Sequence, residues 1–333
     1  MGLRVGLLGG GSWGTTVASL VARNTDVKLW ARDPAKVEEI NAHHTNEKYL
    51  PGATLPDNLH AVGTVEEAVH DIDVLVMGIP SQGFRGALEA VQPHLRAWVP
   101  VISLTKGLEQ DTGLRMTQII EEVLPGHPVG VLTGPNLARE IMAGQAAASV
   151  IAMEDEIIVR ELQSLFRSGL FRVYTNTDVV GCELGGVLKN IIAIAVGMGD
   201  GQGAGDNTRS ALITRGLAEV TRLGTAMGGR EQTFAGLAGM GDMIATCTSP
   251  QSRNRHVGCE LGKGRRLDDI IEEMVMVAEG VKSAPTVIAL AEQYGIDMPI
   301  ARDVYRVVVE GGSARQAFRG LLRVEPRGES EPG

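Results

Sequence analysis

A lysine and an asparagine stand side by side in an apolar run, and this pair is where the sequence first points to chemistry. Lys189 and Asn190 lie within residues 185–195, and no proline interrupts residues 182–198, so we expect one buried helix. A buried ammonium or amide is costly unless something pairs with it. Because buried lysines readily lose their proton, we interpret Lys189 as a proton donor or acceptor.

The surroundings of Lys189 leave two interpretations open. Helical spacing places Gly185, Gly186 and Ala193 on its face, and such small residues would let a ligand or another domain come close. In the alternative, Lys189 extends its ammonium to the surface and Asn190 has a capping role.

A glycine-rich turn near the start of the chain has the spacing of a dinucleotide-binding loop. Residues 4–8 are typical of a buried parallel strand and residues 15–23 of a helix, and Gly9, Gly11 and Gly14 form G-x-G-x-x-G between them. Such glycines let the backbone approach a pyrophosphate, which the helix N-terminus then holds. The strand–helix context favours this hypothesis over a simple glycine turn.

The end of the second predicted strand, residues 27–30, bears on the choice of nucleotide. Arg32 can meet the 2′-phosphate of NADP, whereas Asp33 can meet the ribose hydroxyls of NAD. Alternatively, Arg32 is a solvated charge and Asp33-Pro34 begins the next helix. We favour NADP or dual use.

Polar residues also follow later strands. Lys106 lies two residues after the predicted strand 99–104, and Gly134 and Asn136 lie in the turn that follows residues 129–132. Strands alternate with helices up to about residue 175, which predicts a doubly wound, mainly parallel sheet that binds ligands at its carboxyl edge. Lys106 is therefore a candidate for an anionic or carbonyl substrate, the alternative being a solvated loop lysine.

The second half of the chain shows helical patterns only. Its first helix is expected to end in a flexible linker at residues 197–207, where glycine recurs at every second position. Asp242 follows a glycine-rich turn and either pairs with Lys189 or caps a helix. Ser252, Arg253 and Asn254 form a compact phosphate clamp, because a guanidinium suits phosphate oxygens. The predicted domains are residues 1–176, residues 177–324 and a disordered tail, residues 325–333.

Composition excludes several classes of function. The net charge of −9 argues against nucleic acid or an anionic membrane surface as a partner. Three cysteines without a C-x-x-C, no signal peptide and no clean membrane span indicate a cytoplasmic protein. The adjacent His43 and His44 face apart on a helix without an acidic or cysteine cluster, so we expect no metal site.

Seven stretches together resemble one family, the bacterial NAD(P)-dependent glycerol-3-phosphate dehydrogenases, over about residues 3 to 323. They are residues 9–15 (GGGSWGT), 105–109 (TKGLE), 133–135 (TGP), 184–190 (LGGVLKN), 208–216 (TRSALITRG), 239–242 (GMGD) and 251–254 (QSRN). The resemblance implies a Rossmann domain followed by an all-helical domain. It also implies reversible reduction of dihydroxyacetone phosphate to sn-glycerol 3-phosphate with NADP(H) or NAD(H), supply of the phospholipid backbone, and a homodimer.

The resemblance also assigns roles to residues. It makes Lys189 the proton donor or acceptor, places Lys106 and Asp242 at the reacting end of the substrate, and keeps Gly134 and Asn190 as substrate contacts. The family commonly has Ser or Thr where this chain has Asn136, whose amide can still donate a hydrogen bond. In the resemblance, Ser252, Arg253 and Asn254 bind the substrate phosphate. The residues that it assigns to nucleotide binding are Gly9, Gly11, Ser12, Trp13, Gly14, Arg32, Lys106, Ala138, Arg253, Val277 and Glu279.

Two rival functions stay open at this stage. Another hydroxyacid or sugar-acid dehydrogenase of the same architecture would need a carboxylate clamp in place of the Ser-Arg-Asn segment. A non-catalytic NADPH sensor would have no use for a buried proton donor such as Lys189.

Overall fold

The computed structural model describes residues 2–274 and 278–321, and these form two compact units. Unit 1 comprises Met1–Thr105 and Arg115–Val179, and unit 2 comprises Lys106–Leu114 and Val180–Gly333. The short segment Lys106–Leu114 therefore groups with the C-terminal half, and it carries Lys106 with it.

Unit 1 is built on an eight-stranded sheet with the order β3-β2-β1-β4-β5-β6-β7-β8. Every neighbouring pair is parallel except β6 and β7, which run antiparallel. The reversal of strand order beside β1 is the topological switch at which such sheets bind nucleotides. The strands are β1 (Val5–Leu8), β2 (Val27–Trp30), β3 (Leu59–Val62), β4 (Val74–Met77), β5 (Val101–Ser103), β6 (Val129–Thr133), β7 (Ala147–Met153) and β8 (Phe171–Asn176).

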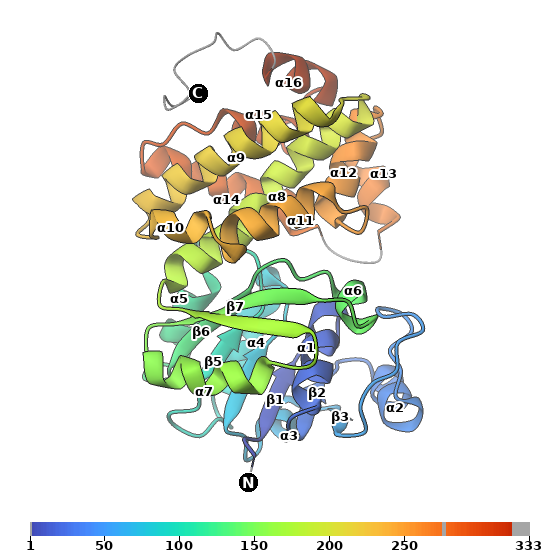
Figure 1. Cartoon of the computed structure of the whole chain (residues 1–333), viewed down its shortest axis with the longest axis vertical. Helices are drawn as coiled ribbons and strands as arrows, with labels where there is room; N and C mark the ends of the chain where they lie inside the picture. The colour runs from blue at the N-terminus through green and yellow to red at the C-terminus, as the bar shows by residue number, and fades with distance from the viewer. Residues whose placement is uncertain (1, 275–277, 322–333) are drawn as a thin grey trace. The chain divides into compact units, whose positions relative to one another are not determined.

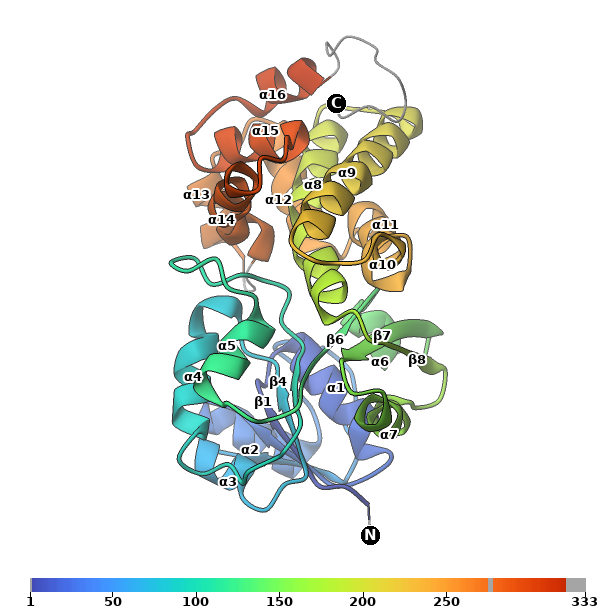
Figure 2. The same ribbon diagram turned by 90° about the vertical axis from the view of Figure 1, so that its left-hand side faces the viewer.

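Helices cover both faces of this sheet. Figure 2 shows α3, α4 and α5 on one side of the strands and α1 and α7 on the other. The central strands β1 and β4 are buried along their whole length, as strands covered on both faces must be. The helices are α1 (Ser12–Ala22), α2 (Pro34–His43), α3 (Val65–Val69), α4 (Phe84–Val91), α5 (Met116–Val123), α6 (Ala138–Met142) and α7 (Glu156–Phe166), with a 3₁₀ turn at Ser81–Gly83.

The named elements of unit 2 are all helices in the residues that the structure describes, and Lys106–Leu114 joins them as a non-helical segment, so the predicted fold class is confirmed. The helix α8 (Val179–Gly201), which carries Lys189 and Asn190, runs through the middle of the other helices (Figure 1). Those are α9 (Asp206–Ala226), α10 (Glu231–Phe234), the π-helix η2 (Leu237–Gly241), α11 (Asp242–Thr248), α12 (Arg253–Gly262), α13 (Leu267–Glu272), α14 (Glu279–Gln293), α15 (Pro299–Val308) and α16 (Ala314–Leu321).

The flexible linker expected at residues 197–207 is wrong for residues 197–201, which are helical, and the connection to α9 is confined to residues 202–205. The helix α8 continues to Gly201, because its glycines face α12 at very short range. A Cβ atom at Gly201 would lie 2.1 Å from the Cys259 carbonyl oxygen, and one at Gly258 would lie 2.1 Å from the Ile194 carbonyl oxygen. Gly197 and Gly201 therefore let two helix backbones pack together, whereas Gly203 and Gly205 lie in the short connection before α9.

The same helix meets the length and composition criteria for a membrane span. Within the described residues, α8 alone does so, but 94% of its apolar window is buried inside the protein. That burial is what the core helix of a globular domain shows.

Candidate active site

The glycine-rich turn between β1 and α1 has the geometry of a phosphate cradle. Gly9 has φ +126°, which favours glycine, and a Cβ at Gly14 would lie 2.0 Å from the Gly9 carbonyl oxygen. At Gly11, by contrast, an added Cβ would meet nothing within 4 Å. The outer glycines thus close the turn, and the middle one faces open space where a ligand can approach the backbone.

The N-terminus of α1 continues this cradle. No side chain caps the helix, and its first turn carries no acid, so its N–H groups remain suited to an anion. The indole Nε1 of Trp13 is buried and has no hydrogen-bond partner within the described protein. These features fit the pyrophosphate and neighbouring polar groups of a dinucleotide.

The end of β2, next to the cradle, carries Arg32 and Asp33, the two candidate contacts for the adenosine ribose of the nucleotide. Asp33 accepts a hydrogen bond from the Ala35 backbone N–H at 3.0 Å and caps α2, while Arg32 is exposed. Asp33 therefore begins the next helix, as the alternative held, and Arg32 is the residue that remains available to a nucleotide.

The turn after β6 holds Gly134 and Asn136. Gly134 has φ +130°, and the Ser149 hydroxyl donates to Asn136 Oδ1 at 2.5 Å. The amide nitrogen Nδ2 of Asn136 is buried without a partner in the described part of the chain. Ala138, a predicted nucleotide contact, is the first residue of α6.

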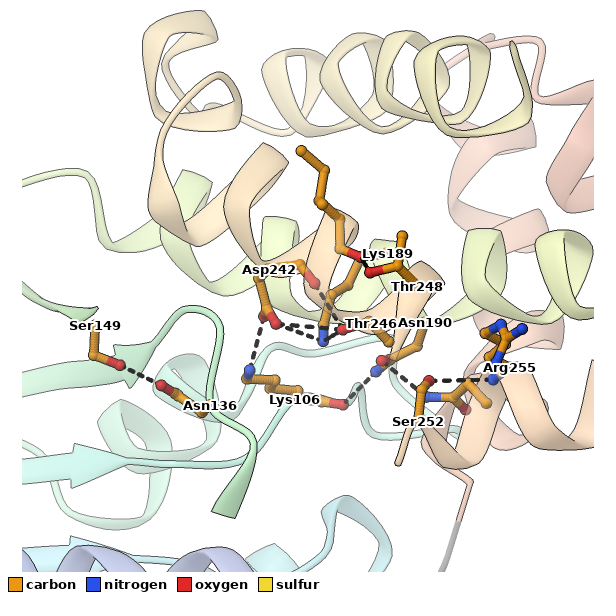
Figure 3. A network of polar contacts seen from close by, with 12 residues as sticks. Lys106, Asn136, Ser149, Lys189, Asn190, Asp242, Thr246, Thr248, Ser252 and Arg255 are labelled. Atoms are coloured by element: carbon orange, nitrogen blue, oxygen red, sulfur yellow. Dashed lines mark hydrogen bonds and ion pairs between the residues drawn. The ribbon is translucent and has the colours of Figure 1, made fainter. Parts of the chain in front are cut away.

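In unit 2, three charged side chains from distant segments converge. Lys189 Nζ donates to Asp242 Oδ1 at 2.7 Å, and Lys106 Nζ donates to Asp242 Oδ2 at 2.7 Å (Figure 3). Lys189 and Asp242 expose only 6% and 2% of their side chains. Of the two interpretations of Asp242, the ion pair with Lys189 is therefore the one that the structure shows. Lys189 does not extend to the surface.

The close approach of η2 to α8 positions this cluster. A Cβ at Gly185 would lie 2.6 Å from the Ala238 carbonyl oxygen, so glycine is needed where η2 packs on α8. A π-helix often marks a functional site, and this one ends at Gly241, immediately before Asp242. Gly185 therefore lets η2, a neighbouring segment of unit 2, come close to α8.

Sequence reasoning missed Thr246. Its hydroxyl accepts a hydrogen bond from Lys189 Nζ and donates to the Asp242 carbonyl oxygen at 2.7 Å. The available signal was its position four residues after Asp242, which places both on one face of α11. Thr246 gives the Lys189 ammonium a second oxygen partner and so fixes its direction.

The electrostatic state of Lys106 follows from its surroundings. The pKa of Lys106 is lowered to about 8, because the effect of desolvation, together with the nearby Lys189 charge, outweighs that of Asp242, which raises it. Because 18% of the Lys106 side chain is exposed, this ammonium remains accessible to a ligand. A lysine with such a pKa can bind an anion at neutral pH and exchange a proton slightly above it.

An amide chain links this cluster to α12. Asn190 Nδ2 donates to the Lys106 carbonyl oxygen at 3.4 Å, and Asn254 Nδ2 donates to Asn190 Oδ1 at 2.9 Å. Asn254 Oδ1 in turn accepts the Gly280 backbone N–H at 3.0 Å. Both ends of the Asn254 amide are therefore engaged within the protein, and its nitrogen holds Asn190 in position. The sequence did not reveal this contact.

The start of α12 carries the other two members of the predicted clamp. The Ser252 hydroxyl accepts the Arg255 backbone N–H at 3.2 Å and caps the helix, and the first turn contains no acid. Arg253 is exposed at the first helical position. A helix N-terminus, a hydroxyl and a guanidinium here form a suitable place for a phosphate.

The predicted site residues thus fall into two groups, one in each unit. Unit 1 gathers the turn residues Gly9 to Gly14, Arg32, Gly134, Asn136 and Ala138, and unit 2 gathers Lys106, Lys189, Asn190, Asp242, Ser252, Arg253 and Asn254. Glu279 is the first residue of α14, and Val277 lies outside the described residues. Across residues 2–274 and 278–321, no three His, Cys, Asp or Glu side chains gather in a way that could hold a metal ion.

Comparison with known proteins assigns both halves of the chain. Residues 4–159 match the NAD-dependent glycerol-3-phosphate dehydrogenase N-terminus, and residues 178–319 match the corresponding C-terminus. A protein from Sphingopyxis alaskensis named glycerol-3-phosphate dehydrogenase [NAD(P)+] 2 is 70% identical over 333 residues, which is 100% of both chains. One from Mycobacterium bovis, glycerol-3-phosphate dehydrogenase [NAD(P)+] 1, is 54% identical over 97% of this chain and 95% of its own.

A solved structure agrees with these matches. The crystal structure of glycerol-3-phosphate dehydrogenase from Coxiella burnetii superposes with a TM-score of 0.93 at 35% identity and covers 96% of this chain and 99% of its own. The family models cover both units, and the relatives align over nearly the full length. The chain therefore belongs to the NAD-dependent glycerol-3-phosphate dehydrogenase family.

Proposed function

We propose that this protein catalyses the reversible NAD(P)H-dependent reduction of dihydroxyacetone phosphate to sn-glycerol 3-phosphate. The observation that carries the proposal is the buried Lys189–Asp242–Lys106 cluster, in a chain whose two halves both match the family. A ketone that gains a hydride needs a proton at its oxygen, and this cluster is built to provide one.

Lys189 is the group we assign to that proton. A nicotinamide held by the cradle would supply the hydride, and the carbonyl oxygen of the substrate would then gain negative charge. The Lys189 ammonium, directed by Asp242 and Thr246, stabilises this charge and then donates the proton from Nζ. Lys106, with its lowered pKa, holds the reacting end of the substrate beside it.

The phosphate of the substrate is assigned to the start of α12. The Arg253 guanidinium and the Ser252 hydroxyl contact its oxygens, and the helix N-terminus favours its charge. Asn254 and Asn190 keep this clamp at a fixed distance from Lys106 through their amide chain. A grip on the remote phosphate orients the carbonyl for reaction.

The cofactor is assigned to the cradle in unit 1. The backbone from Gly9 to Gly14 binds the pyrophosphate, with Ser12, Trp13, Arg32 and Ala138 as further contacts. The other nucleotide contacts that the family membership implies are Lys106, Arg253, Val277 and Glu279. In this assignment, residues 1–176 bind the nucleotide, and residues 177–324 together with Lys106 bind the substrate and perform catalysis. The proposed disordered tail, residues 325–333, lies outside the described residues.

Asn136 is proposed as a substrate contact through its amide nitrogen. Its Oδ1 accepts from Ser149, which leaves Nδ2 as a buried donor without a partner in the described chain. We expect Asn136→Ser to retain activity, because a hydroxyl can replace this donor, and Asn136→Leu to raise the KM for the substrate. Equal KM values for all three proteins would remove Asn136 from the site.

The decisive experiment follows oxidation of the reduced nicotinamide by absorbance. The reaction is started with dihydroxyacetone phosphate, then repeated with dihydroxyacetone and with a panel of 2-keto acids, each with NADPH and with NADH. Rapid oxidation that needs the phosphate establishes the reaction. Turnover of a keto acid instead would support the related hydroxyacid dehydrogenase, and tight NADPH binding without turnover would support a sensor.

Assembly and location extend the proposal. We infer a homodimer in the cytoplasm that supplies sn-glycerol 3-phosphate for phospholipid synthesis, because the family membership implies this role. Light scattering after size exclusion should give twice the chain mass of 35.3 kDa. A mass of one chain across micromolar concentrations would overturn the dimer and leave the reaction untouched.

A further inference from the structure

Three charged side chains of unit 2 meet beside the start of α12, apart from the Lys189 cluster. Asp200, in the last turn of α8, accepts hydrogen bonds through Oδ1 from Nε and Nη2 of Arg209 at 3.1 and 2.9 Å. Its Oδ2 lies 2.7 Å from both Nε and Nη2 of Arg255. The Asp200 side chain is only 7% exposed. One carboxylate thus joins α8, the first turns of α9 and α12, and we call these three residues the Asp200 cluster.

The end of α8 is an unfavourable place for a carboxylate, and the two guanidinium groups make it possible. The helix dipole opposes negative charge at a C-terminal end, and burial removes the water that would stabilise Asp200. The hydrogen bond from Arg209 to Asp200 raises the pKa of Arg209, so this partner stays charged. Because each planar guanidinium binds one carboxylate oxygen from a defined direction, the cluster fixes geometry more than it adds net stability.

Arg255 carries this geometry into the first turn of α12. Its backbone N–H donates to the Ser252 hydroxyl oxygen at 3.2 Å (Figure 3), and a Cβ at Gly197 would lie 2.2 Å from its carbonyl oxygen. Side chains two positions apart point to nearly opposite sides of a helix. While Arg255 faces Asp200, Arg253 therefore faces away from it, where it is exposed. Holding Arg255 against α8 sets the direction of Arg253.

Arg209 belongs to a stretch of the chain to which the proposed function gives no role. It lies in residues 208–216, one of the seven stretches that resemble the family, yet neither the substrate nor the nucleotide was assigned to it. We propose that Asp200 and Arg209 are positioning residues for the phosphate clamp, which they align through Arg255. The inference rests on the proposed function, because it takes the start of α12 as the place of the substrate phosphate.

The Asp200 cluster acts on the phosphate end of the substrate and leaves the reacting end alone. Without Arg209, Asp200 keeps a single guanidinium at an unfavourable helix end, so the first turn of α12 loses part of its fixed support. A displacement of about 1 Å in a group that orients the substrate can lower the rate about 10²-fold. Lys189 takes its direction from Asp242 and Thr246 instead. A ketone without a phosphate does not use the clamp and does not sense the change.

The test compares two ketones that differ only in the phosphate. Initial rates of NADPH oxidation by the full-length protein give kcat/KM for dihydroxyacetone phosphate and for dihydroxyacetone. Arg209→Gln should lower the first value by about 10- to 100-fold and keep the second within about 2-fold of the wild type, which also shows that the variant is folded. Arg209→Lys keeps the charge but not the fork, so it should lose less than Arg209→Gln.

A matched variant and the other outcomes decide the proposal. Arg265→Gln removes a guanidinium just beyond the other end of α12, where it pairs with Glu260 and Glu273, and it should leave both values unchanged. An equal fall for both ketones in Arg209→Gln would mean that the cluster only holds unit 2 together, and no fall for either would mean that it does not align the clamp. Each result would overturn the proposal. A wild type that oxidised NADPH with neither ketone would instead refute the proposed reaction.

Discussion

The two candidate binding regions differ in what they are made of. The cradle of unit 1 consists mainly of backbone from one continuous stretch, Gly9 to Gly14, left open at Gly11. The catalytic cluster of unit 2 consists of side chains from three segments separated by 83 and 53 residues, if Lys106, Lys189 and Asp242 are counted along the chain. A backbone site is defined by local geometry, whereas a side-chain site depends on packing at every contributing segment.

The largest effect should come from removing the proton donor. We expect Lys189→Ala to lower kcat about 10³-fold or more, because both charge stabilisation and proton donation are lost, while the Kd for NADPH changes by less than about 2-fold. Steady-state kinetics and NADPH fluorescence titration measure the two quantities. Lys189→Met, which keeps the volume, serves as the control for packing. A large loss of NADPH affinity in both variants would make Lys189 structural.

The charge of Asp242 is the next target. Asp242→Asn removes the group that raises the pKa of Lys106, so that pKa should fall below about 8. Since Lys106 stabilises the negative charge that grows at the reacting end of the substrate only while it is protonated, kcat/KM should fall as pH rises through this pKa. The alkaline limb of the profile should move to lower pH in the variant, with a loss of about 10²-fold at neutral pH.

A matched variant checks that this shift is local. Asp268→Asn removes an exposed carboxylate on α13 that pairs with Arg266, and it should leave the profile in place. If the alkaline limb stayed fixed in Asp242→Asn as well, Lys106 would not be the titrating group.

The packing of α12 on α8 in unit 2 should be sensitive to any side chain added where the two helix backbones approach each other. A Cβ at Gly258 would lie 2.1 Å from the Ile194 carbonyl oxygen, so Gly258→Ala should lower the free energy of unfolding by about 1–3 kcal/mol. Chemical denaturation measures this change. Gly86→Ala on α4, where an added Cβ meets nothing within 4 Å, should have no effect or a small stabilising one.

The cradle should give the opposite result to the same kind of substitution. Gly11→Ala adds a Cβ in open space, so stability should stay within about 0.5 kcal/mol of the wild type. The Kd for NADPH should rise by about 10-fold, because the methyl group keeps a pyrophosphate away from the backbone. An unchanged Kd would mean that no phosphate approaches this turn.

Sequence reasoning was strongest where a pattern is local. The alternation of buried strands and helices predicted the fold class, and the seven motifs predicted the family, both of which are confirmed. The strand β3 was missed, because Leu59–Val62 alternates buried with more exposed residues and so lacks the continuous apolar run of β1 and β4. The antiparallel β7 also needed the structure, since its residues are as apolar as those of a parallel strand.

The prediction from sequence was wrong where glycine could serve either a loop or a close contact between helices. Glycines at alternate positions were interpreted as a linker at residues 197–207, yet Gly197 and Gly201 continue α8 against α12. Glycine permits both a loop and a close helix contact, and the composition of a segment does not distinguish them. Only the position of α12, more than 50 residues further on, resolves the choice.

Short-range sequence patterns were thus sufficient to predict the architecture, the family and the cradle, because the hydrophobic period and the glycine spacing each act over a few residues. The tertiary structure decided that Thr246 and Asp242 direct Lys189 and that Asn254 holds Asn190. Each of these contacts joins two segments whose distance is set by packing between them. For Lys189 and Asp242, that packing is the backbone approach at Gly185, which no single segment specifies.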